Sequence, residues 1–211
     1  LREAGILEFC IITGWKANVI EEFFGDGSRC GVSICYVRQE VQDGTGKAPE
    51  LAKKFVGAAP FLLTYGDILV KTETYGQMIE RWGEGDFSGL VTVTGSEDVT
   101  KGGLFFFDEK FCLNHLVEKP TAAQLDELRA AGRLKVGETA WYNAGIYIFD
   151  DVILQHKEIE LNKILDIGND LLPQFINKMK GYIIKEFILD IGTYENYTYA
   201  NNYVSKHPDY F

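Results

Sequence analysis

Two aspartates, Asp67 and Asp190, stand in similar local settings far apart in the chain. Asp67 ends an apolar run that starts at Phe61, Asp190 ends one that starts at Phe187, and a glycine lies next to or near each acid. Ligands of α/β proteins bind where strands end, so an acid there can hold a metal ion that binds phosphate. If the two carboxylates meet, their hard oxygen atoms would suit Mg²⁺, with positions left for phosphate oxygens. Two independent aspartates in turns would produce the same pattern.

Polar residues adjoin two further predicted strands, Glu118 and Lys119 at the end of one and Asn143 before the start of the other. Glu118 and Lys119 precede Pro120, which stops strand pairing. A glutamate there can accept hydrogen bonds from two sugar hydroxyls, and the neighbouring lysine can bind a phosphate as a point charge. Asn143 offers an amide beside small residues that allow close approach of a backbone. Taken alone, each segment is also typical of an ordinary solvated turn or strand entry.

A glycine-containing loop can read a nucleobase. Gln39 presents a side-chain amide, and residues 44–46 (Gly-Thr-Gly) expose backbone groups. The sequence contains neither a Gly-x-Gly-x-x-Gly run nor the Gly-x-x-x-x-Gly-Lys-Ser/Thr run of P-loops. A phosphate would therefore have to be bound through a metal, backbone amides or a few placed lysines.

The elements that must position these residues alternate between strands and helices. Buried strands are predicted from apolar runs at residues 9–13, 32–36, 61–67, 88–94, 104–107, 113–117, 146–149, 182–184 and 187–190. Helices are predicted at residues 18–24, 48–55, 75–82, 121–132 with a Thr121–Gln124 capping box, and 193–201 with Thr193 as the cap. The alternation indicates an α/β sheet, and a predicted hairpin of strands 104–107 and 113–117 makes that sheet mixed.

Composition limits the classes of function. The 211 residues, 46% of them hydrophobic, can bury a core as one domain over residues 1–211. The formal net charge is −10 and no basic stripe is present, so we expect no nucleic-acid partner and no membrane partner. No apolar run is long enough to span a bilayer, and no signal-peptide pattern opens the chain. Together with four cysteines that form no Cys-x-x-Cys pair, these features predict a cytoplasmic protein with buried free thiols.

The ordered set of segments resembles the sugar-1-phosphate nucleotidyltransferases, or nucleotide-sugar pyrophosphorylases. The segments are GDGSRCGVSICYVRQ, DGTGKA, FLLTYGD, LVEKP, NAGIYIF, DLLP and DIGTYENY, which together cover nearly the whole chain. Each is weakly specific alone, whereas the series in this order is strongly specific. The resemblance implies a Rossmann-like three-layer α/β/α sandwich with a mixed, mostly parallel sheet. It also implies Mg²⁺-dependent transfer of a nucleotidyl group from an NTP to a sugar 1-phosphate, with release of pyrophosphate.

The resemblance also implies roles for individual residues. As catalytic residues it implies the metal pair Asp67 and Asp190, with Lys119 anchoring the sugar phosphate. As substrate-binding residues it implies Gln39, Gly44 and Thr45 for the base, and Gly103, Glu118, Lys119 and Asn143 for the sugar. The base, the sugar and the oligomeric state stay open, a homo-oligomer included.

The beginning of the chain departs from the family pattern. The family normally opens with a strand and a Gly-rich loop containing Gly-Thr-Arg, followed by a Pro-Lys-Pro stretch, and none of these is present. Residues 1–5 resemble the last turn of a helix that Gly5 ends, so we expect upstream sequence to be missing. Without the segments that grip the triphosphate, we expect this chain to be a poor catalyst.

Two alternatives belong to other functional classes. A noncatalytic regulatory subunit would keep the nucleotide-sugar pocket and lack the triphosphate loop. A glycosyltransferase using a finished nucleotide sugar would share the sheet, but it normally has an Asp-x-Asp metal motif. Residues 65–67 (Tyr-Gly-Asp) offer only one acid at that position.

Overall fold

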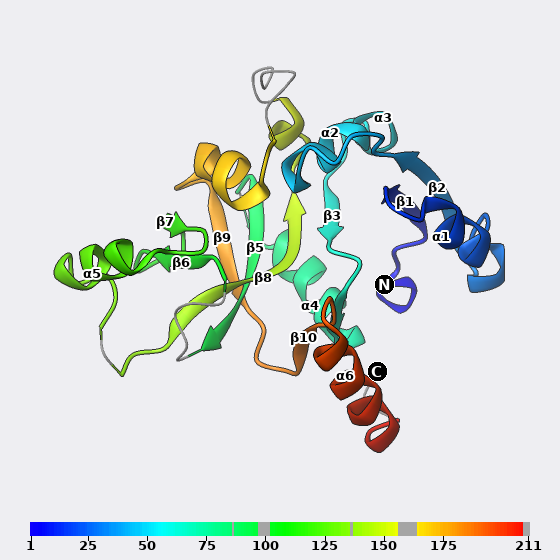
Figure 1. Ribbon diagram of the computed structural model, residues 1–211. Coiled ribbons are helices and arrows are strands. Elements are labelled where there is room, and N and C mark those ends of the chain that lie inside the picture. Colours follow the sequence, from blue (N-terminus) through cyan, green and yellow to red (C-terminus); the bar gives the residue numbers. More distant parts are fainter. Residues whose placement is uncertain (86, 97–101, 136, 156–163, 209–211) are drawn as a thin grey trace.

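The computed structural model describes residues 1–85, 87–96, 102–135, 137–155 and 164–208 (Figure 1). The strands are β1 (Glu8–Thr13), β2 (Ser33–Arg38), β3 (Phe61–Thr64), β4 (Ile68–Val70), β5 (Gly89–Ser96), β6 (Leu104–Phe107), β7 (Leu113–Val117), β8 (Ala140–Phe149), β9 (Met179–Ile183) and β10 (Ile188–Asp190). The α-helices are α1 (Ala17–Phe24), α2 (Ala48–Leu51), α3 (Lys53–Val56), α4 (Thr72–Gly83), α5 (Ala122–Ala130) and α6 (Tyr194–Lys206). Short helical turns are η1 (Arg2–Ala4), η2 (Ser28–Cys30), η3 (Thr45–Lys47), η4 (Asp151–Gln155), η5 (Ile167–Leu171) and η6 (Leu172–Phe175).

The largest sheet is mixed, as the sequence predicts. Its strands lie in the order β7-β6-β8-β5-β9, and β3 pairs with β8 as well. β1 and β2 form a parallel ladder of their own, and β4 pairs antiparallel with β10. Figure 1 shows the β1–β2 ladder and α1 beside β3, on the opposite side from β6, β7 and α5.

The expectation of a mostly parallel sheet is wrong for the described strands. Only β1–β2 and β5–β9 pair in parallel, whereas β3–β8, β5–β8, β6–β8, β6–β7 and β4–β10 are antiparallel. The reason is the position of β8, which inserts antiparallel between β3 and β5. β3, β5 and β9 run in the same direction, but β3 and β5 are separated by β8 and so do not pair with each other.

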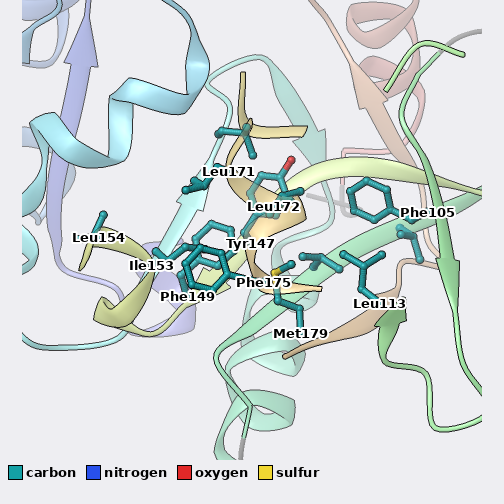
Figure 2. Close-up of a cluster of buried hydrophobic side chains, with 13 residues drawn as sticks. Phe105, Leu113, Tyr147, Phe149, Ile153, Leu154, Leu171, Leu172, Phe175 and Met179 are labelled. Carbon is teal, nitrogen blue, oxygen red and sulfur yellow. The ribbon is translucent and has the colours of Figure 1, made fainter. Parts of the chain in front are cut away.

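Strand β8 is buried on both faces, which explains its continuous apolar sequence. Tyr147 and Phe149 belong to a cluster on one face that the turns η4, η5 and η6 cover. Figure 2 shows these two rings among Leu171, Leu172 and Phe175. Side chains of the intervening β8 residues belong to a second cluster on the other face, with Tyr75 and Met78 of α4. The sheet therefore lies between two helical layers.

Several local predictions are confirmed. β6 and β7 form the predicted antiparallel hairpin, and α5 begins with the predicted capping box of Thr121 and Gln124. Thr193 caps α6 by accepting a hydrogen bond from the backbone N–H of Asn196 at 3.2 Å. The chain opens with a helical turn that ends at Gly5, whose φ of 83° is left-handed. The helix predicted over residues 48–55 is instead divided into α2 and α3.

The expectation of buried thiols is wrong. Cys10 and Cys112 are half-buried, and Cys30 and Cys35 are exposed. Cys10 and Cys35 lie on the narrow β1–β2 ladder, which the main sheet does not extend, so neither strand is covered as an interior strand would be.

None of the helices in the described part of the chain has the length and apolarity that a membrane span requires.

Candidate active site

The two aspartates identified in the sequence lie together. Asp67 lies in the turn between β3 and β4, and Asp190 is the last residue of β10. In the β4–β10 ladder Asp190 is paired with Ile68, the residue that follows Asp67. The backbone N–H of Ile191 donates to the carbonyl of Asp67 at 2.8 Å and extends this pairing. The acids are therefore neighbours because these two short strands pair.

Gly192 lies between the two carboxylates. A Cβ at this position would be 2.9 Å from Oδ2 of Asp67 and 3.0 Å from Oδ1 of Asp190. The backbone N–H of Gly192 donates to Oδ1 of Asp190 at 2.7 Å and so orients that carboxylate. In the described ranges no three His, Cys, Asp or Glu side chains form a metal-binding group. Two hard oxygen ligands around a space that glycine leaves open fit Mg²⁺, which commonly takes its remaining ligands from water and substrate.

Gln39 organises the loop around residues 43–46, which the sequence predicts to read a nucleobase. Its Nε2 donates to Oδ1 of Asp43 at 2.8 Å and to the carbonyl of Gly44 at 3.0 Å. Lys47 forms an ion pair with Asp43 at 2.7 Å, and these hydrogen bonds from Lys47 and Gln39 lower the pKa of the Asp43 carboxyl. The side-chain amide of Gln39 therefore organises the loop in addition to any contact that it makes with a base.

This loop docks on residues that are far away in the sequence. The N–H of Gly46 donates to the carbonyl of Leu165 at 2.8 Å, and the N–H of Leu165 donates to the backbone carbonyl of Asp43 at 2.7 Å. Gly44 has φ of 102°, and a Cβ there would be 2.0 Å from the Leu165 carbonyl oxygen, so only glycine is accommodated. The hydroxyl of Thr45 donates to Oδ2 of Asp166 at 3.3 Å.

Gly103, Glu118 and Asn143 form one cluster, as the sequence predicts for a sugar pocket. The N–H of Asn143 donates to the carbonyl of Gly103 at 3.0 Å. A Cβ on Gly103 would be 2.3 Å from Oε2 of Glu118, so the absence of a side chain is what admits this carboxyl group. Gly168 packs against the same oxygen, which a Cβ would approach to 2.6 Å.

A bulge in β8 gives this cluster its shape. The pairing with β5 shifts between Val91, opposite Tyr147, and Val93, opposite Asn143. Gly145, within the bulge, has φ of 75°. Four residues of a regular strand would separate Asn143 and Tyr147 by roughly 13 Å. Instead the Tyr147 hydroxyl hydrogen-bonds to the Asn143 amide, 2.7 Å from Nδ2 and 2.9 Å from Oδ1.

Glu118 titrates differently from an exposed glutamate. Burial raises the pKa of its carboxyl, the carboxylate of Asp166 raises it further, and the ammonium of Lys119 lowers it. Lys119 itself is exposed and has φ of 44°, an uncommon conformation for a residue with a side chain. The carboxyl of Glu118 therefore holds its proton to a higher pH than an exposed glutamate does.

Three residues of the cluster were not identified from the sequence as site residues. Asp166 accepts a hydrogen bond from Thr45 and interacts electrostatically with Glu118, Tyr147 hydrogen-bonds to Asn143, and the Tyr65 ring lies 6.3 Å from that of Tyr147. The pKa of the Tyr65 phenol is raised by burial, while hydrogen bonds to Tyr147 and Thr45 oppose the rise. The only available signal was for Tyr65, which stands two residues before Asp67.

The sequence-predicted residues thus form three groups in the structure. Asp67 and Asp190 are one group, and Gly103, Glu118 and Asn143 are another. Gln39, Gly44 and Thr45 form the third, which Asp166 joins to the second. Tyr65 connects the groups, because it interacts with Thr45 of the third group and with Tyr147, which hydrogen-bonds to Asn143 of the second, and it lies in the same turn region as Asp67.

The chain matches a family model and known proteins over most of its length. The family model described as "Nucleotidyl transferase" matches residues 1–207. The low-salt glycan biosynthesis nucleotidyltransferase Agl11 of Haloferax volcanii is 35% identical over 121 residues, which cover 57% of this chain and 34% of that protein. The mannose-1-phosphate guanylyltransferase catalytic subunit beta of Drosophila melanogaster is 24% identical over 197 residues, covering 91% of this chain and 48% of that protein. The chain thus spans half or less of these relatives.

Solved structures share the fold. A UDP-glucose pyrophosphorylase complexed with UDP-glucose superposes with a TM-score of 0.74 at 23% identity, over 98% of this chain and 83% of that one. Because the identity is low, this similarity supports the Rossmann-like α/β fold and nothing finer. The match of the family model over nearly the whole chain decides the relationship. The chain belongs to the nucleotidyl transferase family, among relatives that are named as sugar-1-phosphate nucleotidyltransferases.

Proposed function

We propose that this protein transfers a nucleotidyl group from an NTP to a sugar 1-phosphate, giving a nucleotide sugar and pyrophosphate. The observation that carries the proposal is the convergence of the Asp67 and Asp190 carboxylates on Gly192. Membership of the nucleotidyl transferase family supports the same class of reaction. We also propose that residues 1–211 act as one domain.

Asp67 and Asp190 would hold Mg²⁺ by one oxygen or more each. When bound, the cation would neutralise charge on the reacting phosphates. The N–H of Gly192 keeps the Asp190 carboxylate oriented, so the pair needs little rearrangement to bind a cation.

The sugar would bind at Glu118 and Asn143. The half-buried carboxyl of Glu118 can accept hydrogen bonds from two hydroxyls, and Tyr147 and the bulge fix the orientation of the Asn143 amide. Lys119, next in the chain, would anchor the sugar phosphate by its charge. So oriented, an oxygen of the sugar phosphate attacks the α-phosphorus of the NTP in line, and the bond from that phosphorus to pyrophosphate breaks.

The base would bind along the loop that contains Gly44 and Thr45. The Nε2 group of Gln39 is engaged within this loop, so Oε1 of Gln39 and the loop backbone are the groups that would read the base. Since Asp166 and Leu165 hold the loop, the base-binding groups are ordered before substrate arrives. Preorganisation of this kind reduces the entropy lost on binding.

The test is pyrophosphate release by the complete protein, measured over a matrix of NTPs and sugar 1-phosphates. We expect release only when an NTP, a sugar 1-phosphate and Mg²⁺ are all present. Asp67→Asn and Asp190→Asn should each lower kcat/KM by about 100-fold or more, because each removes a charged ligand. Asp126→Asn, which changes an exposed acid paired with Arg129 on α5, is the matched control and should retain activity.

Two outcomes would contradict the proposal. If Asp67→Asn and Asp190→Asn released pyrophosphate at the wild-type rate, as the Asp126→Asn control should, the carboxylate pair would not be the metal site. If a nucleotide sugar bound to the complete protein but no pairing of substrates released pyrophosphate, the noncatalytic regulatory subunit would be the better description.

A further inference from the structure

Two cysteines face each other across the β1–β2 ladder. Cys10 and Cys35 are direct partners in its parallel register. Neighbouring strands are about 4.8 Å apart, and the Cα atoms of a disulfide are usually about 4.4–6.8 Å apart. Side chains of paired residues project from the same face of a sheet, so the side chains of Cys10 and Cys35 lie on the same face of the ladder. The ladder therefore satisfies the main geometric requirement for a disulfide without a change in backbone pairing.

The thiols lie on the face of the ladder that α1 does not cover. On the other face, Arg38 of β2 donates to Oε1 of Glu21 at 2.9 Å, and Thr13 of β1 donates to the same oxygen at 3.2 Å. Residues alternate between faces along a strand, so Cys35 and Cys10, each three residues before these, project away from α1. Cys35 is exposed and Cys10 is half-buried, so a reagent in solution can reach one of the two thiols directly.

We propose that Cys10 and Cys35 are a vicinal dithiol that low-molecular-weight disulfides oxidise to an intramolecular disulfide. This modification site is independent of the proposed nucleotidyl transfer. Nothing in it requires the residues that would bind substrate, because the pair lies on the strands that precede Gly14 and Gln39.

The chemistry is a thiol–disulfide exchange in two steps. The Cys35 thiolate attacks one sulfur of the small disulfide, whose S–S bond breaks and releases one thiolate. The Cys10 thiolate then attacks Sγ of Cys35 and displaces the second small thiolate. Two protein thiols are oxidised to one disulfide, the reagent is reduced to two thiols, and the two protein protons end on them. Burial and the neighbouring Cys35 raise the pKa of Cys10 to about 12, so little Cys10 is a thiolate, and we assign the first attack to the exposed Cys35.

The test is treatment of the complete, reduced protein with glutathione disulfide at mildly alkaline pH. We expect the protein mass to fall by two hydrogen atoms and two thiols of this chain to become unreactive towards a thiol reagent. A peptide map without reduction should link the peptide containing Cys10 to the one containing Cys35. In the Cys10→Ser variant the reaction should stop at a stable mixed disulfide between Cys35 and glutathione. The Cys35→Ser variant should form no linked peptide.

Cys30→Ser and Cys112→Ser are the matched controls, because neither residue belongs to the β1–β2 ladder. Both controls should oxidise as the wild type does. The proposal would be overturned if the Cys10 and Cys35 peptides stayed unlinked in the wild-type protein. It would also be overturned if Cys35 paired with Cys30, or if the linkage joined two protein molecules. The wild-type map decides the question even if a serine variant does not fold.

Discussion

At the scale of single residues, the site depends on carboxyl groups whose surroundings differ. Glu118 lies half-buried beside Asp166, whereas Asp67 and Asp190 are exposed and converge on a glycine. Burial penalises a charge, so Glu118 holds its proton more tightly than an exposed glutamate. An exposed pair keeps its charges available to a cation. These different surroundings support the roles proposed above, hydroxyl binding for Glu118 and metal binding for the two aspartates.

The raised pKa of Glu118 predicts a dependence of stability on pH. The folded protein binds this proton where the unfolded chain releases it, so the contribution of Glu118 to stability is complete below its unfolded pKa. It is lost as the pH rises through the higher folded pKa. Glu118→Gln removes this titration. As the pH rises from acid to neutral, the free energy of unfolding of the variant should therefore increase relative to that of the wild type. Urea unfolding at several pH values measures the difference.

The control for this prediction is Glu127→Gln, which changes an exposed residue of α5. The difference between this control and the wild type should not change with pH in the same way. A Glu118→Gln variant whose stability relative to wild type stayed constant over this pH range would refute the burial argument.

Gly192 provides a second test at this scale. Gly192→Ala would insert a methyl group about 3 Å from an oxygen of each aspartate and push the carboxylates apart. Since misplacement by about 1 Å can cost about 100-fold in rate, we expect kcat for pyrophosphate release to fall by that order. Gly66→Ala is the matched control, because Gly66 also adjoins Asp67 and a Cβ there meets no atom within 4 Å. Equal effects of the two substitutions would contradict the assignment.

At the scale of elements, the bulge in β8 brings the Asn143 side chain to Tyr147 and so shapes the candidate site. A strand buried on both faces would normally be regular, yet β8 departs from its register with β5 at Ala144–Ile146. Thr92 stabilises the departure, because its hydroxyl donates to the carbonyl of Ile146 at 2.6 Å and accepts from the N–H of the same residue at 3.2 Å. Bulges often redirect side chains next to active sites.

Gly145→Ala tests the bulge. The φ of 75° disfavours any side chain, and a Cβ would lie 2.7 Å from the Tyr65 ring, so we expect destabilisation by about 1–3 kcal/mol. Gly76→Ala within α4 is the control, because a Cβ there meets nothing within 4 Å and alanine favours helix by about 0.5–1 kcal/mol. Urea unfolding should therefore show shifts of opposite sign for the two variants.

At the scale of the whole molecule, contacts among the residues that the structure describes join the N-terminal part to the main sheet. The loop containing Gly44 and Gly46 hydrogen-bonds to Leu165, and Leu1 and Ala4 pack against the cluster that includes Met78. These contacts lie at both ends of the β1–β2 segment. They support the proposal that residues 1–211 act as one domain.

If the unit is one domain, it should unfold in one cooperative step. We expect urea transitions followed by far-ultraviolet circular dichroism and by tryptophan fluorescence to coincide, since Trp15 lies beside the β1–β2 ladder whereas Trp82 and Trp141 lie in the main body. Trp15→Phe and Trp82→Phe variants would assign the signal to each part. Two separate midpoints would show that the ladder is a subdomain of its own.

The sequence by itself determined the order of elements, the hairpin, two helix caps and most of the site's residue types. These features depend on local periodicity, caps and turns, which act over a few residues. It also singled out Glu118, Asn143 and the two aspartates as candidate site residues, because the sequence pattern places each beside a predicted strand, although Asn143 lies within β8 in the structure.

Only the tertiary structure decided which of these residues meet. The pairing of β4 with β10 brings Asp67 to Asp190, and docking of the loop on Leu165 brings Thr45 to Asp166. The insertion of β8 between β3 and β5 makes most pairs antiparallel, although the sequence pattern of a strand is the same in either direction. Pairing and docking join residues that are far apart in the chain, and no local pattern carries that information.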